Sequence, residues 1–192
     1  MARPREFNRD EVLERAMQVF WSKGYTATSM RDLTEAMGLS KSSLYDTFGS
    51  KHDLFLESID FYRDNVTVQV RSVAELERPA MQVIAAVLGR AVDRILEPNG
   101  RRGCFLNNCA VEIGPVDDKA AERLRAGFGV MEETFLRLVR RAQLEGAISP
   151  TRDALSLARY LTSTVNGIMV IGKANPDRTV LDDIVRVAMA SL

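Results

Sequence analysis

The side chains with the most specific chemistry lie between residues 28 and 51 of this 192-residue chain. Leu44 and Phe48 are four residues apart and mark the inner side of a short helical pattern. A surface helix usually carries Glu and Lys, whereas this one carries hydroxyls, a phenol, one cation and one carboxylate: Lys41, Ser42, Ser43, Tyr45, Asp46 and Thr47. Because such groups hydrogen-bond to phosphates and base edges, we expect this helix to read DNA.

The preceding residues predict the element that would position this helix. Leu33 and Met37 mark the buried side of an earlier short helix, and Gly38 supplies a tight turn between the two. Ser40 is suited to cap the second helix. Two short helices joined at a glycine are typical of a helix-turn-helix motif.

Within this motif we assign phosphate contacts to the charged and phenolic groups. Lys41, Tyr45 and Lys51 are expected to meet phosphates, Lys51 with help from the free amides at the start of the next helix. Thr28 and Ser29 would fix the register from the start of the first helix of the motif. The alternative for each lysine is an ordinary solvated charge. The candidates for base edges are Ser42, Ser43, Asp46 and Thr47.

Overall composition gives no sign of a nucleic-acid partner, because 26 Lys and Arg residues balance 26 Asp and Glu residues. The positions of the charges are more informative, and Arg3 and Arg5 are expected to form an arm that enters the minor groove. No membrane-spanning run or signal peptide is predicted, so we expect a cytoplasmic protein with no membrane partner. In that compartment Cys104 and Cys109 would be reduced thiols.

Helical patterns cover nearly the whole chain, so the predicted fold class is all-α with about nine helices. A first helix is expected to follow a capping pattern at Asn8 and to end at Gly24. After the motif, helices are expected over about residues 51–71, 79–97, 102–113, 117–145, 149–173 and 177–192. Residues 1–49 are predicted to form the helix-turn-helix DNA-binding domain, and residues 50–192 a larger helical domain.

The helix expected over residues 149–173 is apolar on two sides. One stripe consists of Ala154, Ala158, Leu161, Val165 and Met169. A second stripe of Leu157, Tyr160, Thr164, Ile168 and Ile171 lies beside it. A helix so largely apolar needs cover from its own domain and from another surface, which favours a homodimer. The alternative is the central helix of a monomeric bundle. The predicted dimer contacts are the first stripe and one side of the last helix: Ala154, Ala158, Leu161, Val165, Met169, Leu181, Ile184 and Val185.

The motif and its flanks resemble the tetracycline-repressor (TetR) family of bacterial transcriptional regulators. The matching residues are Phe20, Gly24, Thr28, Ala36, Gly38, Ser40, Lys41, Leu44, Tyr45, Phe48, Lys51 and Leu54. The resemblance implies a homodimer with a three-helix DNA-binding head, a fourth helix leading to a ligand-binding domain, and dimerisation through the last two helices. We therefore expect a dimeric repressor that a small molecule releases from its operator. Asp46 departs from the pattern, because an aromatic or basic residue is frequent there.

The helices after residue 50 are expected to enclose the effector pocket. Core packing is the plain alternative for the aromatic candidates. No cofactor or metal is expected. With His52 as the one histidine and no nucleophile–base set or phosphate loop, we expect no enzyme. The candidate effector contacts are Phe61, Tyr62, Cys104, Phe105, Asn108, Glu112, Phe128 and Phe135.

Cys104 leads to an alternative function. Arg101 and Arg102 precede it near a predicted helix start, an environment that favours thiolate. The segment from Gly103 to Leu106 also resembles a branch of the family in which some members respond to electrophiles or oxidants through cysteine. A redox- or electrophile-sensing repressor that uses Cys104 is therefore the alternative, beside a packing role for the thiol. A helical adaptor that has lost DNA binding is a remote alternative, suggested by Asp46.

Overall fold

Capping side chains define where most of the helices begin. Each accepts a hydrogen bond from a backbone amide in the first turn of its helix, where amides lack a partner within the helix. The helix boundaries are therefore largely set by local sequence. The capping residues are Asn8, Ser29, Ser40, Ser50, Asp117, Asp153 and Asp177.

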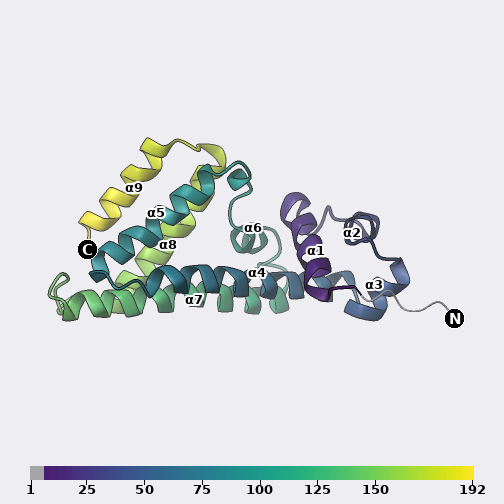
Figure 1. The fold of residues 1–192 in the computed structure, drawn as a ribbon, viewed down its shortest axis with the longest axis horizontal. Helices are drawn as coiled ribbons and strands as arrows, with labels where there is room; N and C mark the ends of the chain where they lie inside the picture. The colour runs from purple at the N-terminus through teal and green to yellow at the C-terminus, as the bar shows by residue number, and fades with distance from the viewer. Residues whose placement is uncertain (1–6) are drawn as a thin grey trace.

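The computed structural model describes residues 7–192, and this part of the chain is all-α, as predicted (Figure 1). Arg3 and Arg5, the predicted minor-groove arm, lie outside the described residues. A short 3-10 helix, η1 (Gly100–Arg102), lies between α5 and α6. The helices are α1 (Arg9–Lys23), α2 (Met30–Met37), α3 (Lys41–Phe48), α4 (Lys51–Ala74), α5 (Ala80–Leu96), α6 (Phe105–Glu112), α7 (Asp118–Leu144), α8 (Ala154–Ala174) and α9 (Arg178–Ala190).

Two helices begin later than predicted. α6 begins at Phe105 because η1 precedes it and Gly103 turns the chain with a φ of +72°. α8 begins at Ala154 because its cap is Asp153. The hydroxyl of Ser149, the predicted first residue, lies 2.8 Å from the Thr151 hydroxyl in the turn before the helix.

Helices α1 to α3 form a head at one end of an elongated molecule, and α4 leads from the head into the body (Figure 1). α4 and α7 run side by side in the same direction, and His52 near the start of α4 hydrogen-bonds to Asp117 at the start of α7, at 2.6 Å. α5, α8 and α9 pack together at the other end. The short α6 lies between the head and this bundle.

The head has no core of its own. As predicted, Leu33, Met37, Leu44 and Phe48 are buried, but their cluster continues through α4 into α6 and the start of α7. A second core joins α5, α7, α8 and α9. The predicted boundary at residues 49 and 50 follows the order of the chain, whereas the packing continues across it.

The two apolar sides of α8 are present, but the predicted dimer contacts on α8 and α9 lie in or against the core of the protomer itself. Ala158, Leu161, Val165, Met169 and Leu181 lie in the protomer's own core, and Ala154, Ile184 and Val185 are half-buried against it. α8 packs on both α5 and α7, so its first stripe, together with Leu157 and Ile168 of the second, is used within the protomer. Helical periodicity defines the stripes without showing which one faces inward. The apolar residues that α8 and α9 leave exposed are Tyr160, Val170, Ile171, Val180 and Val187.

α8 is also long and apolar enough, by length and composition alone, to cross a membrane, which the sequence analysis did not anticipate. It is the one such helix within residues 7–192. In the structure it packs against α5, α7 and α9 as a core helix of the bundle.

Candidate DNA interface and regulatory pocket

α3 presents the predicted polar side chains on the side opposite its buried residues. Tyr45 is 42% exposed, and the Lys41 Nζ lies 6.0 Å from the centre of its ring. The Thr47 hydroxyl donates to the backbone oxygen of Ser43 at 2.7 Å, so it is partly engaged within the helix. The exposed residues of this face are Lys41, Ser42, Tyr45 and Asp46, and the half-buried ones are Ser43 and Thr47.

Ser40 both caps α3 and orients two of its hydroxyl groups. Its Oγ accepts a hydrogen bond from the Ser43 amide at 3.1 Å. The same oxygen lies 2.9 Å from the hydroxyl oxygens of Ser42 and Ser43. A hydroxyl has one donor and two acceptor positions, so both side chains keep hydrogen-bonding capacity for a phosphate or a base edge.

Lys51 stands at the first position of α4. Its Nζ lies 4.4 Å from the centre of the Tyr25 ring. Partial burial lowers the pKa of Lys51, and the nearby Glu112 carboxylate opposes that shift. A cation beside a helix N-terminus is a favourable place for a phosphate.

The expected DNA contact of Thr28 does not fit the structure. Its side chain is 2% exposed, and its hydroxyl donates to the backbone oxygen of Gly24. Ser29 occupies the capping position instead: its Oγ accepts the Asp32 amide, and the Asp32 carboxylate accepts the Ser29 amide. Thr28 is therefore buried in the turn between α1 and α2, and Ser29 alone of the two stands at the helix start.

A cavity of about 470 Å³ lies between α4, α5, α7 and α8, with the start of α6 at one side. Its size is within the range of small-molecule sites. Most of its wall is apolar, with a few polar groups from α4, α5 and α8. Its lining residues are Tyr62, Val66, Gln69, Val70, Val73, Val87, Arg90, Ala91, Arg94, Glu97, Cys104, Leu106, Gly127, Phe128, Met131, Val165, Asn166 and Met169.

Three groups at one wall of this cavity form a hydrogen-bonded series. The Arg94 Nη2 donates to the Tyr62 hydroxyl at 2.9 Å, and that hydroxyl donates to the Cys104 Sγ at 3.6 Å. Burial, and then the neighbouring thiol, raises the pKa of Tyr62, so its phenol stays protonated at neutral pH. Arg94 therefore meets Cys104 through Tyr62, while Arg102 is turned away toward Gln18 of α1.

Three of the eight predicted effector contacts, Tyr62, Cys104 and Phe128, line the cavity. The other five lie elsewhere. Phe61, Phe105 and Phe135 pack in the cores, as aromatics at helical spacing usually do. Asn108 donates to the Arg102 backbone oxygen and accepts from the Lys173 ammonium. Arg90 and Arg94 were not predicted to line the cavity, although their spacing of four residues places both on one side of a helix.

Glu112 joins the head to the body instead of lining the cavity. From the last position of α6 its carboxylate accepts the backbone amides of Tyr25 at 3.0 Å and Thr26 at 2.8 Å. Partial burial would raise the pKa of Glu112, but these amides outweigh it and lower the pKa below its ordinary value. The carboxylate is therefore ionised at neutral pH and fixes the α1–α2 turn against α6.

The two cysteines differ in environment. Cys104 is the N-cap residue of α6, half-buried, and faces the cavity. Cys109 is buried in the core, and burial raises the pKa of its thiol. Both are free thiols. Of the two, only Cys104 can be reached from the cavity.

Three of the five exposed apolar residues of α8 and α9, Tyr160, Ile171 and Val187, line an open groove. Tyr160, Thr164, Gly167 and Ile171 line it from α8. Ile184 and Val187 line it from α9, and Val187 is 55% exposed. Asp183 of α9 also lines the groove, so the surface is largely apolar with one carboxylate. A largely apolar exposed surface on two adjacent helices is typical of a protein–protein interface.

Comparison with known proteins decides the family. A model described as "Bacterial regulatory proteins, tetR family" matches residues 12–58, the head and the start of α4. A model described as "Tetracyclin repressor-like, C-terminal domain" matches residues 80–188, more than half of the chain. The chain belongs to the TetR family. It is a DNA-binding transcriptional regulator and not an enzyme, as predicted.

Relatives of known sequence and structure agree with this assignment. YezE of Bacillus subtilis (strain 168), an uncharacterized HTH-type transcriptional regulator, is 31% identical over 100% of both chains. The repressor ComR of Escherichia coli (strain K12) is 29% identical over 88% of this chain and 80% of its own. A cysteine mutant of the TetR family regulator CifR, solved with 26-base-pair double-strand operator DNA, is 32% identical, covers 98% of both chains and superposes with a TM-score of 0.87.

Proposed function

We propose that this TetR-family protein is a homodimeric, cytoplasmic repressor that a small-molecule effector releases from its operator. The observation that carries the proposal is the continuity of α4: it begins at Lys51, to which we assign a phosphate contact, and its later turns line the cavity. A molecule that enters the cavity therefore touches the same helix that supports the head. ComR, a repressor, and CifR, which is complexed with operator DNA, support the DNA-binding half of the proposal.

The apolar groove on α8 and α9 supports the dimer. Two heads related by a two-fold axis read inverted half-sites about 34–36 Å apart, or a multiple of that distance. An effector that favours a different head spacing lowers the affinity for both half-sites together. Typical coupling of about 1–3 kcal/mol corresponds to a 5- to 150-fold change in affinity.

The test combines assembly and DNA binding. Purified protein is analysed by sedimentation at micromolar concentration, and then by gel shift against a fragment from upstream of its own gene. The proposal expects a dimer that retards this fragment and ignores a coding-region fragment of equal length. A monomer contradicts the dimer. A dimer that binds neither fragment supports the helical adaptor.

A cysteine-sensing repressor is the second candidate, because Cys104 faces the cavity and its sulfur accepts a hydrogen bond from Tyr62. In this mechanism the Cys104 thiolate adds to an activated carbon–carbon double bond. A C–S bond forms, and the adjacent carbon takes a proton from water. The added group occupies the cavity in place of a non-covalent effector.

A further inference from the structure

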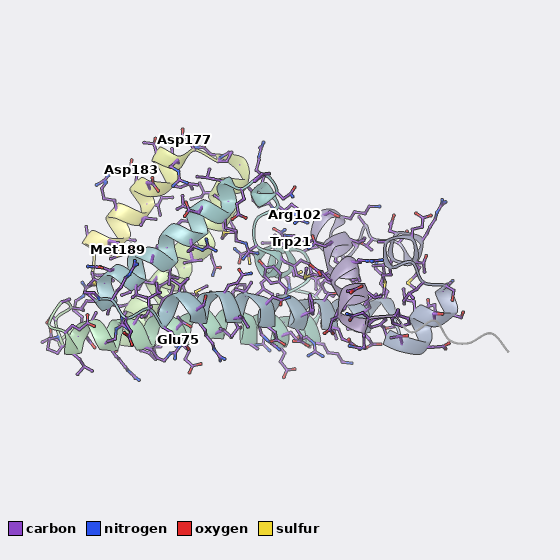
Figure 2. The ribbon with its side chains drawn as sticks, viewed as in Figure 1. Trp21, Glu75, Arg102, Asp177, Asp183 and Met189 are labelled. Carbon is purple, nitrogen blue, oxygen red and sulfur yellow. The ribbon has the colours of Figure 1, made fainter. Side chains whose placement is uncertain are left out.

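Trp21 connects the head to the wall of the cavity. It belongs to α1, yet its ring lies 5.1 Å from that of Tyr62, which lines the cavity, in an edge-to-face arrangement. The guanidinium carbon of Arg102 lies 4.3 Å from the centre of the Trp21 ring, and that of Arg94 lies 5.8 Å away. Figure 2 shows Trp21 and Arg102 together where the head meets the body. The indole of the head therefore contacts two cations from outside the head, one from η1 and one from α5.

Arg94 is a half-buried cation without a counter-ion among residues 7–192. Its one hydrogen bond in this part of the chain goes to the neutral phenol of Tyr62, and its remaining contacts are the faces of Trp21 and Tyr62. Glu97 lies three residues on and also lines the cavity, but it is exposed and makes no ion pair with Arg94. A guanidinium beside an apolar cavity is costly to keep unpaired, and it is well suited to a carboxylate, which it binds through two hydrogen bonds.

The rest of the cavity sets the shape of a matching ligand. Arg90, one turn before Arg94, adds a second positive charge at the same wall. Val66, Val70 and Val73 of α4 and Met131 of α7 supply apolar surface to the same cavity. An anionic head group with an apolar body satisfies both parts, whereas a cation would be repelled and a neutral molecule would leave Arg94 unpaired.

We propose that the effector is an amphipathic organic carboxylate whose anionic group binds Arg94. This deepens the proposed function and rests on it. The carboxylate draws the Arg94 guanidinium away from the Trp21 ring and from the Tyr62 hydroxyl. The contacts of Trp21 with the cavity wall, and with them the packing of the head on the body, then change when the ligand binds. Trp21 is thus both a contact between head and body and a reporter of ligand, since it is the only tryptophan in the chain.

The test needs no DNA. The full-length protein is titrated with octanoate, decanoate and 4-phenylbutyrate, with heat and Trp21 emission recorded together. 1-Octanol and octylamine serve as the neutral and cationic controls of matched length. The proposal expects at least one carboxylate to bind about tenfold or more tightly than 1-octanol and to change Trp21 emission. If all three carboxylates fail to bind, or bind no better than 1-octanol, the proposal is wrong.

Substitution locates the site. Arg94→Gln is expected to weaken carboxylate binding about tenfold or more while leaving 1-octanol binding unchanged, and Arg94→Lys to retain part of the affinity. Arg140→Gln removes an exposed arginine of α7 outside the cavity and is the control. Carboxylate affinity equal to wild type in Arg94→Gln overturns the assignment. Failure of the wild-type protein to bind DNA in the gel shift would instead overturn the proposed repressor function. The two failures are therefore distinguishable.

Discussion

A few individual residues connect the head to the body. Glu112 accepts two backbone amides of the α1–α2 turn, Lys51 lies over the Tyr25 ring of the same turn, and Trp21 reaches the cavity wall. Neither Glu112 nor Trp21 was predicted in this role. A carboxylate that accepts backbone amides 86 and 87 residues away leaves no local signal in the sequence, because the pairing exists only once α6 has docked.

Replacing Glu112 with Gln is expected to lower the free energy of unfolding by about 0.5–1.5 kcal/mol, because an amide offers one acceptor oxygen to two amides. The native pKa of Glu112 is lowered, so its contribution is present above the ordinary glutamate pKa and is lost as pH falls through the native value. The stability difference between wild type and Glu112→Gln should therefore shrink below about pH 4. Urea unfolding at pH 7 and pH 3.5 measures it. Glu132→Gln, which removes a surface ion pair with Arg159, is the control and should change little at either pH.

Lys51→Ala is expected to weaken binding to all DNA sequences alike and to reduce the salt slope by about one unit, because one phosphate contact is lost. Asp46→Ala should instead change which bases are preferred, because an exposed carboxylate on α3 repels phosphate or accepts from a cytosine amine. Binding isotherms at four salt concentrations, on matched and shuffled DNA, separate the two effects. An unchanged slope for Lys51→Ala would show that the lysine meets no phosphate.

Cys104 is expected to react with a maleimide faster than Cys109, because it faces the cavity, whereas burial raises the pKa of the Cys109 thiol and keeps it protonated. If Cys104 is a sensor, stoichiometric labelling lowers the DNA affinity of wild type but not that of Cys104→Ser. Mass spectrometry of timed samples gives the order of reaction. Faster labelling of Cys109 would contradict the environments described above.

At the scale of elements, the sequence predicted the helices well and their partners less well. Capping residues and apolar spacing are local signals, so the all-α fold and most boundaries were predictable. The start of α6 was not, because Arg101 and Arg102 are compatible with a helix and only the packing of η1 separates them from it. Which stripe of α8 faces the core was also beyond periodicity. The cavity residues of α4 and α5 have the sequence pattern of ordinary core or surface residues. Only the packing of the helices shows that they line a cavity.

Two substitutions in α8 should therefore have opposite effects. Leu161→Ala removes a fully buried core side chain and is expected to cost about 2–5 kcal/mol of protomer stability. Ile171→Glu places a charge in the exposed groove and should abolish the dimer while leaving the helical content unchanged. Sedimentation and thermal unfolding are measured on both. A fully dimeric Ile171→Glu would mean that the groove is not the dimer interface.

At the scale of the whole molecule, one elongated body carries a head at one end, a cavity in the middle and an exposed apolar groove on its α8–α9 face (Figure 1). α4 extends from the head to the cavity, and α6 lies between the head and the cavity. In the proposed mechanism, movement of a head changes the spacing of two heads only if a dimer ties them together. The dimer and the DNA geometry are therefore parts of a single claim.

Hydroxyl-radical footprinting on the fragment upstream of its own gene tests this claim most directly. Wild type should protect two stretches that form an inverted repeat, with centres about one helical turn or a whole number of turns apart. Ile171→Glu should lose both stretches together at the same concentration. A single protected stretch without a repeat, or an undiminished footprint from monomeric Ile171→Glu, would contradict a dimeric repressor.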